Sequence, residues 1–225
     1  MSAELDHFFI CTSRGAPEVE QLARFGLAEG APNRHPGQGT ANRRFFFENA
    51  FLELLWVEDP TETQSALVRR TGLWERWSNR CDGASPFGVC LRSAGTEPSG
   101  APFATWEYRP PYLPAPLVIH MSASSQISQS PLLFYIAFGR RPDADDPSRR
   151  QPLKHPAGLR AITRLEIAVP MGSQSHPPEQ EALEQQCSDV RVVGGSGHLV
   201  EVSFDGRKLG QTADFRPALP LVFHW

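Results

Sequence analysis

Residues 5–10 read LDHFFI, and residues 51–57 read FLELLWV. Both are short apolar runs of the kind that forms β-strands, and each carries one side chain able to bind a metal, His7 in the first run and Glu53 in the second. A buried carboxylate is unfavourable unless it is paired, hydrogen-bonded or bound to a metal, so Glu53 needs a partner and His7 is the nearest candidate. If the two strands lie side by side, they hold half of a divalent-metal site.

The alternation of the first run predicts which side chains share a face. Every second side chain of a strand points the same way. We therefore expect Leu5, His7 and Phe9 on one face, and Asp6 and Phe8 on the other. The face that carries the imidazole is then otherwise apolar.

The composition is that of an ordinary globular protein. Of its 225 residues 40% are hydrophobic and 21% charged, and a net charge of -3 gives no general attraction to nucleic acid or to an anionic membrane. The sequence opens without a basic and apolar leader, and no apolar run approaches the ~18 residues of a membrane span. We therefore expect a cytoplasmic protein that binds a small-molecule substrate, with a homodimer as its expected assembly.

The order of elements predicts two modules, residues 1–80 and residues 81–225. The first is expected to hold a strand, a helix, two antiparallel strands and a second helix, at residues 5–12, 17–26, 41–48, 50–58 and 61–78, with an edge strand near 27–32. The second is interrupted by an exposed Pro-rich connection at 140–160. Its expected strands are residues 86–92, 103–109, 116–122, 131–138, 162–169, 189–193 and 197–204, with a short helix at 178–186.

A weak internal repeat lays residues 162–168 over the first apolar run, and residues 199–202 over the start of the second. On this register Glu201 takes the place of Glu53, and Arg164 stands where the first run has its imidazole. The low identity leaves a chance match as the alternative.

Four segments resemble the vicinal oxygen chelate superfamily, which includes glyoxalase I, extradiol dioxygenases and fosfomycin-resistance proteins. They are LDH at residues 5–7, HPGQGTAN at residues 35–42, FLEL at residues 51–54 and DFRPALPL at residues 214–221. More narrowly, the chain resembles the glyoxalase-like domain proteins. The resemblance covers residues 5–58 well and residues 84–225 more weakly.

The resemblance implies an α+β fold in which paired βαβββ modules form curved mixed sheets around a cup, with helices on the outer faces. In the superfamily the first and last strands of each module contribute one metal ligand apiece, which assigns His7 and Glu53 to the first module.

The second module departs from this pattern. Its first-strand place falls on Gly88 if the module begins near residue 86, or on Arg164 if it begins at residue 162. Neither residue is an ordinary ligand, so His120 and Glu201 are the reserve ligands, and Glu201 is also a candidate catalytic carboxylate. For His120 the alternative is a structural histidine on its strand. For Glu201 the alternative is an ion pair with Arg191 or Arg164.

The two leading candidates also have structural alternatives. His7 is either a ligand that points into the cup or a buried histidine bonded to a neighbouring carbonyl. Glu53 is a ligand, or a general base with a pKa raised by burial. Its alternative is an ion pair with Arg43 or Arg44 of the adjoining strand.

The remaining candidates bind the substrate. His35, Thr40 and Asn42 offer hydrogen-bonding groups near the mouth of the cup, or else stabilise a structural turn. Arg164 suits a substrate carboxylate or phosphate. The aromatic and Pro-rich run at 106–112 either walls a pocket or forms a packed edge or dimer contact.

Two functions follow. In the first, a divalent metal (Zn, Fe, Mn, Ni or Co) chelates two neighbouring oxygens of a small organic substrate and acts as a Lewis acid in lyase, isomerase or dioxygenase chemistry. In the second, the cup has a degenerate metal site and the protein binds or sequesters a small molecule without catalysis.

Overall fold

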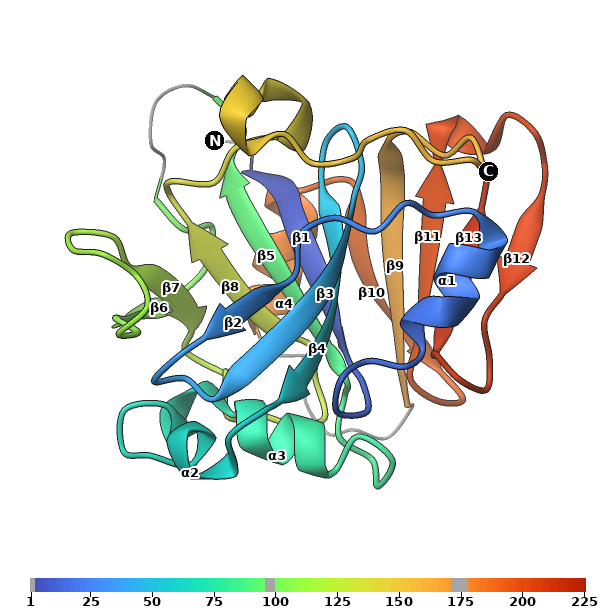
Figure 1. Ribbon diagram of the computed structural model, residues 1–225. Coiled ribbons are helices and arrows are strands. Elements are labelled where there is room, and N and C mark those ends of the chain that lie inside the picture. The colour runs from blue at the N-terminus through green and yellow to red at the C-terminus, as the bar shows by residue number, and fades with distance from the viewer. Residues whose placement is uncertain (1–2, 96–99, 171–177) are drawn as a thin grey trace.

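The chain folds into two mixed β-sheets, seen in a computed structural model that describes residues 3–95, 100–170 and 178–225 (Figure 1). The first sheet has eight strands in the order β2-β3-β4-β1-β5-β8-β7-β6, and the second has five in the order β10-β9-β11-β13-β12. The strands of the first sheet are β1 (Ala3–Cys11), β2 (Asn33–His35), β3 (Thr40–Phe46), β4 (Phe51–Val57), β5 (Phe87–Ser93), β6 (Thr105–Tyr108), β7 (Ile119–Ser122) and β8 (Leu132–Ile136). The strands of the second are β9 (Ile162–Pro170), β10 (Val190–Gly195), β11 (Leu199–Phe204), β12 (Thr212–Asp214) and β13 (Leu221–His224). The helices are α1 (Val19–Phe25), α2 (Pro60–Thr63), α3 (Leu73–Ser78) and α4 (Pro178–Gln186), with 3-10 turns at 69–71, 142–144, 147–149 and 205–207.

The eight-stranded sheet consists of two similar halves. β1 pairs in parallel with β4, and β5 pairs in parallel with β8. The halves meet where β1 and β5 pair antiparallel in the middle of the sheet. The curved α+β sheet predicted from the family resemblance is therefore present, and its second half begins at Phe87.

The internal repeat that begins at residue 162 is wrong. β4 runs parallel to β1, whereas β11 runs antiparallel to β9. Residues 199–202 therefore do not hold the place of residues 51–54, and the strands from β9 onward form a separate sheet.

The two faces of the eight-stranded sheet bury different side chains. Phe8 and Leu52 belong to a large apolar core shared with the five-stranded sheet. Phe9 is the next residue after Phe8 on β1, and Leu55 lies further along β4 than Leu52, on the opposite face. Phe9 and Leu55 belong to a second cluster on the concave face. The period of two along each strand thus assigns one face to the sheet-to-sheet core and the other to the cup.

The alternation fails at Asp6, where a β-bulge interrupts β1. Leu5 lies opposite Leu91 and His7 lies opposite Cys90, which leaves Asp6 as the extra residue. Leu5 therefore packs into the main core while His7 faces the cup. The prediction that Leu5 shares the face of His7 is wrong for this reason.

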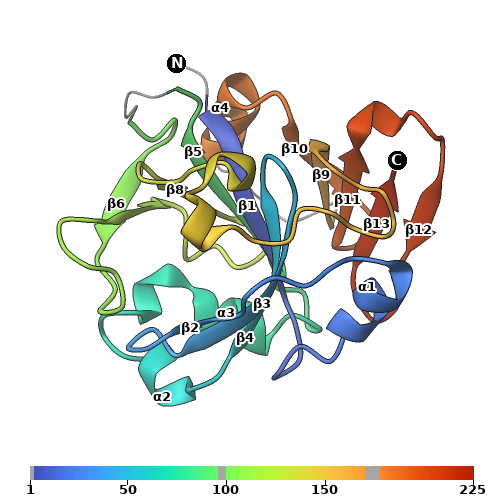
Figure 2. The same ribbon diagram turned by 45° about the horizontal axis from the view of Figure 1, so that its top comes forward.

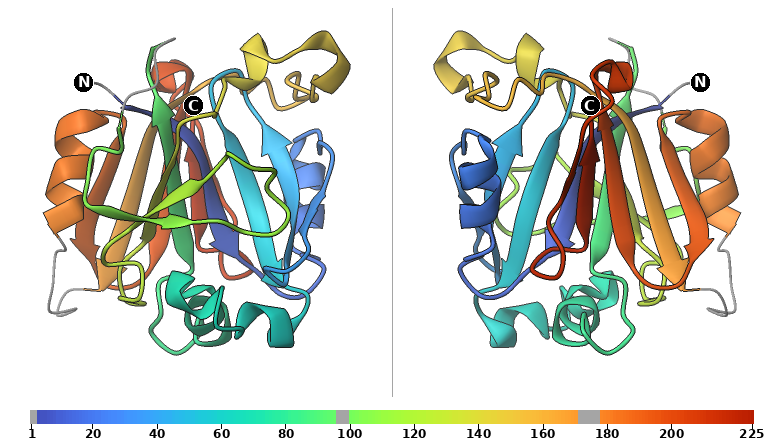
Figure 3. Two further views of the ribbon diagram at one scale, coloured as in Figure 1. Left: turned by 90° about the vertical axis from the view of Figure 1, so that its left-hand side faces the viewer. Right: turned by 90° about the vertical axis from the view of Figure 1, so that its right-hand side faces the viewer.

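The helices lie in two places. Val19 and Leu22 of α1 and Leu183 of α4 pack into the core between the sheets, and Figure 3 shows these helices on opposite flanks of the molecule. By contrast α2 and α3 lie on the same side as the β6–β7 hairpin, away from the five-stranded sheet (Figure 2). Because Leu73 of α3 lines the cup, this helix does not follow the expectation of helices on outer faces. None of the helices among the described residues is both long and apolar enough to cross a membrane.

The single helix predicted at 61–78 is three short segments. Asp59 caps α2 by accepting from the backbone of Thr61 and Glu62, and α2 ends after one turn. Gly72, with φ of 70°, then separates the 3-10 turn at 69–71 from α3. Gly72 therefore ends the 3-10 turn and begins α3, whose first residue, Leu73, lines the cavity.

The connection at 140–160 is largely exposed, and its buried residues are Pro142, His155 and Leu159. His155 accepts from the backbone nitrogen of Ala28 at 2.9 Å and donates to the carbonyl of Phe46 at 2.9 Å. Burial lowers the pKa of His155, which favours the neutral ring that these two bonds require. The connection is thereby attached to β3.

Candidate active site

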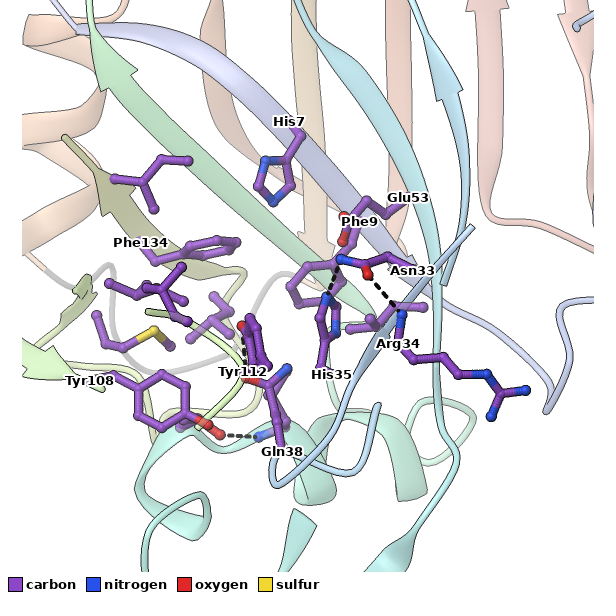
Figure 4. A pocket seen from close by; sticks show the side chains of 18 of the residues that line it. His7, Phe9, Asn33, Arg34, His35, Gln38, Glu53, Tyr108, Tyr112 and Phe134 are labelled. Atoms are coloured by element: carbon purple, nitrogen blue, oxygen red, sulfur yellow. Dashed lines mark hydrogen bonds between the residues drawn. The ribbon is translucent and has the colours of Figure 1, made fainter. Parts of the chain in front are cut away.

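A cavity of about 610 Å³ lies over the concave face of the eight-stranded sheet (Figure 4). Its walls are mostly apolar and combine side chains of both halves of the sheet. The apolar lining includes Phe9, Phe51, Leu55, Leu73, Ile119, Met121, Leu132 and Phe134. The polar lining includes His7, Asn33, Arg34, His35, Gln38, Arg44, Glu53, Tyr108 and Tyr112. A concave apolar pocket with a few converging polar groups is typical of a small-molecule site.

His7 is fixed in the cavity wall by two aromatic rings and a carboxylate. Its ring stacks on Phe51 with centroids 4.5 Å apart and meets Phe134 edge-on at 5.4 Å. Its Nδ1 lies 2.7 Å from the Oδ1 of Asp6. Since an ionised carboxylate only accepts, Nδ1 carries the proton and donates. Nε2 makes no hydrogen bond to a described residue and remains for a ligand.

The pKa of His7 reflects opposing effects. Burial, the largest effect, lowers it, whereas the charge of Glu53 and the hydrogen bond and charge of Asp6 raise it. The net result is a pKa above the ordinary value for histidine. His7 is therefore suited to carry a proton near neutral pH.

Asp6 and Arg92 support His7 from behind, and neither role was predicted from the sequence. The Arg92 guanidinium, almost completely buried, lies 3.4 Å from Asp6 and 2.9 Å from Glu4, and donates to the carbonyls of Leu5 and Asn49 at 2.8 Å each. The bulge turns the Asp6 carboxylate towards both His7 and Arg92. A bulge depends on the residue count of the partner strand, so strand periodicity alone does not reveal it.

Glu53 is 8% exposed and is held by an amide rather than a cation. Its Oε1 accepts from Asn42 Nδ2 at 2.8 Å, and Oε2 has no hydrogen bond within the described part of the chain. Arg43 pairs with Glu29 instead, at 2.6 Å. Arg44 lies opposite Glu53 in the strand register, yet none of the described ion pairs joins them within 4.0 Å. The ion-pair alternative for Glu53 is therefore not realised.

The predicted substrate-binding loop mainly supports other side chains. Of His35, Thr40 and Asn42, only His35 lines the cavity. Asn33 Nδ2 donates to His35 Nε2 at 3.2 Å, so His35 Nδ1 is protonated and donates to Thr40 Oγ1 at 2.9 Å. Burial lowers the pKa of His35, in keeping with a neutral ring. Thr40 and Asn42 therefore orient His35 and Glu53 from behind.

The other three candidates lie away from the cavity. His120 lies on β7 between Ile119 and Met121, which line the cavity, so its side chain belongs to the opposite face. Glu201 bonds to His224 at 2.9 Å, and Arg164 bonds to Glu166 at 2.9 Å, both in the five-stranded sheet. The structure thus brings His7 and Glu53 together and separates them from His120, Glu201 and Arg164.

The second half of the sheet supplies no metal ligand at the corresponding places. The resemblance matches the first-strand place of His7 with Gly88 in the second half. Because His7 lies opposite Phe51 and Gly88 lies opposite Leu132, this match places Phe134 where the first half has Glu53. A Cβ at residue 88 would lie 2.0 Å from the Phe9 ring, so any larger residue there would have to displace this ring. A protein metal site normally has three or four protein ligands, and this cavity offers His7 and Glu53.

Asp6, His7 and Cys90 form a second group, with candidate ligand atoms within 4.8 Å of one another. Its chemistry does not suit a metal. Arg92 neutralises Asp6, and the Nδ1 of His7 already donates to that carboxylate. Burial raises the pKa of Cys90 well above its ordinary value, whereas a metal binds the thiolate. The residues present therefore do not fit a resident divalent metal.

Tyrosines of the aromatic run at 106–112 do line the cavity. Tyr112 packs on His35 with ring centroids 4.7 Å apart, and its hydroxyl donates to Gln38 at 3.4 Å. Tyr108 is 2% exposed, and its hydroxyl has no partner among the described residues. Burial raises the pKa of both tyrosines, so both remain hydrogen-bond donors.

Comparison with known proteins matches most of the chain to one family. The model of the glyoxalase-like domain family matches residues 5–183, a span that includes all eight strands of the first sheet. A hypothetical protein from Staphylococcus aureus has a similar structure over 100% of this chain and 99% of its own, with a TM-score of 0.52 and 11% sequence identity, which shows the fold alone. A hypothetical protein from Bacillus halodurans C-125 aligns over 65% of this chain and 100% of its own, with a TM-score of 0.40 and 10% identity. No curated protein matches the sequence.

Proposed function

The chain belongs to the glyoxalase-like domain family, and we propose that it binds a small organic molecule in the cavity and moves a proton on that molecule with Glu53 and His7. The observation that carries this proposal is the pairing of two proton-transfer groups in one apolar cavity. Each group has one atom fixed by the protein, Oε1 of Glu53 by Asn42 and Nδ1 of His7 by Asp6. Each keeps its other atom for the ligand.

The two groups suit complementary roles. The Glu53 carboxylate accepts a proton from a carbon next to a carbonyl group of the substrate. His7, protonated because of its raised pKa, donates from Nε2 to the carbonyl oxygen on which negative charge develops. The product of this step is an enol, with one proton on Glu53 and a neutral His7. Return of the proton to another carbon, or departure of a leaving group, completes an isomerase or lyase reaction.

The divalent metal expected from the resemblance has no step in this proposal. Zn, Fe, Mn, Ni or Co would find two protein ligands in the cavity, and the ligand itself would have to supply most of the coordination. The charge stabilisation that a metal would provide is assigned instead to the His7 imidazolium.

A binding protein without catalysis is the second candidate. Gly88 and Phe134 occupy the places where the resemblance implies ligands, and apolar walls favour retention of a hydrophobic molecule. In this case His7 and Glu53 position the ligand by hydrogen bonds and move no proton.

Deuterium exchange distinguishes the two candidates. We would incubate the protein in D2O with 4-phenylbutan-2-one and with 2-oxo-4-phenylbutanoate, and follow by NMR the loss of the protons next to the carbonyl. Catalysis is expected to accelerate exchange, and Glu53→Gln is expected to reduce the enzymatic rate about 100-fold or more. Glu201→Gln is the matched control, since this carboxylate lies in the other sheet.

Either of two results would contradict the catalytic proposal. One is binding of both compounds without acceleration of exchange, which favours the binding protein. The other is an equal loss of exchange in the Glu53 and Glu201 variants, which would assign the effect to something other than the cavity carboxylate.

A further inference from the structure

Arg44 lines the cavity and forms no ion pair with a carboxylate in the described part of the chain. Its Nε donates to the carbonyl of Ala31 at 2.8 Å, and its guanidinium lies 5.0 Å from the Phe46 ring centroid and 6.0 Å from that of Phe51. The two terminal nitrogens make no hydrogen bond to a described residue. These contacts fix the direction of the side chain and leave its two terminal nitrogens available to a ligand.

Neighbouring arginines differ in this respect. Arg34, which also lines the cavity, is largely exposed and lies 3.3 Å from Glu58, while Arg43 lies 2.6 Å from Glu29. Arg92 has two carboxylates. Arg44 is half-buried without one, and burial lowers its pKa while the charge of Glu53 raises it. A guanidinium remains charged in proteins, so a neutral ligand that covered Arg44 would desolvate a cation without compensation.

The rest of the cavity suits an apolar body. Most of its lining is apolar, with Phe51, Phe134 and Met121 among these side chains, while His7 and Glu53 are the polar groups used in the proposed function.

We propose that the ligand is an organic acid with an apolar body, whose carboxylate pairs with the terminal nitrogens of Arg44. This inference rests on the proposed function only in that the cavity binds a small organic molecule. It does not require proton transfer. Bidentate guanidinium–carboxylate pairs combine two charge-assisted hydrogen bonds and orient the acid along the cavity.

A displacement assay with a matched pair of competitors tests this inference. The neutral fluorophore N-phenyl-1-naphthylamine reports occupancy of an apolar cavity, and 4-phenylbutyrate and 4-phenylbutanamide compete for it. These competitors have the same shape and differ in charge. We expect the acid to displace the fluorophore at a concentration at least tenfold lower than the amide.

Three variants assign the preference to one residue. Arg44→Gln is expected to abolish the preference for the acid, and Arg44→Lys to restore part of it because the charge returns without the bidentate geometry. Arg43→Gln, at the neighbouring arginine of β3 that does not line the cavity and is paired with Glu29, is expected to leave the preference unchanged. Circular dichroism of each variant verifies that the fold is retained.

The outcomes separate the two proposals. Equal displacement by acid and amide in the wild type, or a preference for the acid that survives in Arg44→Gln, would overturn the inference and leave the proposed function standing. Failure of the fluorophore and both competitors to bind the wild-type protein would contradict the proposed function itself.

Discussion

Asp6→Asn tests how the charge of the Asp6 carboxylate changes the pKa of His7. The substitution keeps the size of the side chain and an acceptor for His7 Nδ1, which lies 2.7 Å from the carboxylate, but removes the charge. Burial then opposes protonation of His7 with the charge of Glu53 as the main remaining compensation. A charge-assisted hydrogen bond is about 1–1.5 kcal/mol stronger than a neutral one, and 1.36 kcal/mol corresponds to about one pKa unit. We therefore expect the pKa of His7 to fall by about one unit.

The same substitution changes the pH dependence of stability. The pKa of His7 is raised in the folded state, so its protonation stabilises the fold. This contribution is complete below the unfolded value of about 6.5 and is lost as the pH rises through the higher folded value. In Asp6→Asn the difference between urea unfolding at about pH 6 and about pH 8.5 is expected to decrease by about 1 kcal/mol.

NMR titration of the His7 ring measures the pKa directly. Glu4→Gln is the matched control, because it removes the other carboxylate bound to Arg92 without touching His7. An unchanged pKa in Asp6→Asn, or an equal decrease in Glu4→Gln, would refute the role assigned to Asp6.

Three other expectations follow from packing and donor chemistry. Gly88→Ala places a Cβ 2.0 Å from the Phe9 ring and is expected to lower the free energy of unfolding by about 1–3 kcal/mol, whereas Gly100→Ala, with nothing within 4 Å, is expected to change it little; equal values for both would contradict the packing described. Tyr108→Phe removes an unsatisfied buried hydroxyl and is expected to raise the free energy of unfolding of the ligand-free protein by about 1 kcal/mol; a decrease would mean that the hydroxyl is hydrogen-bonded. Protein purified without a tag or chelator is expected to contain far less than one divalent metal per chain by mass spectrometry, and a stoichiometric metal that disappears in His7→Ala would contradict the donor set assigned to the cavity.

The strands that form the cup were predictable because their signal is local. Period-two alternation located β1, β3, β4 and the four strands β5–β8. The adjacency of the strands that carry His7 and Glu53 was only a hypothesis, which the pairing of β1 with β4 confirms. A carboxylate on an apolar face requires an explanation wherever it occurs, which made Glu53 visible from the sequence. Both side chains line the same cavity.

The remaining features depend on contacts between distant residues. The bulge at Asp6 exists because β1 has one residue more than β5 over the same length. The identity of the second half of the sheet was ambiguous between β5 and β9, since each begins an apolar run and only strand pairing separates them. From the sequence, Arg44 was a candidate ion-pair partner of Glu53. We infer that it donates to the ligand because it forms no ion pair among the described residues.

A crystal structure with 2-oxo-4-phenylbutanoate bound tests most directly whether the concave face is the working site. The expected result is density inside the cavity, with the keto oxygen about 3 Å from His7 Nε2 and the carbon next to it facing Glu53. Density confined to the outer surface or to the five-stranded sheet, with the cavity filled only by water, would contradict it.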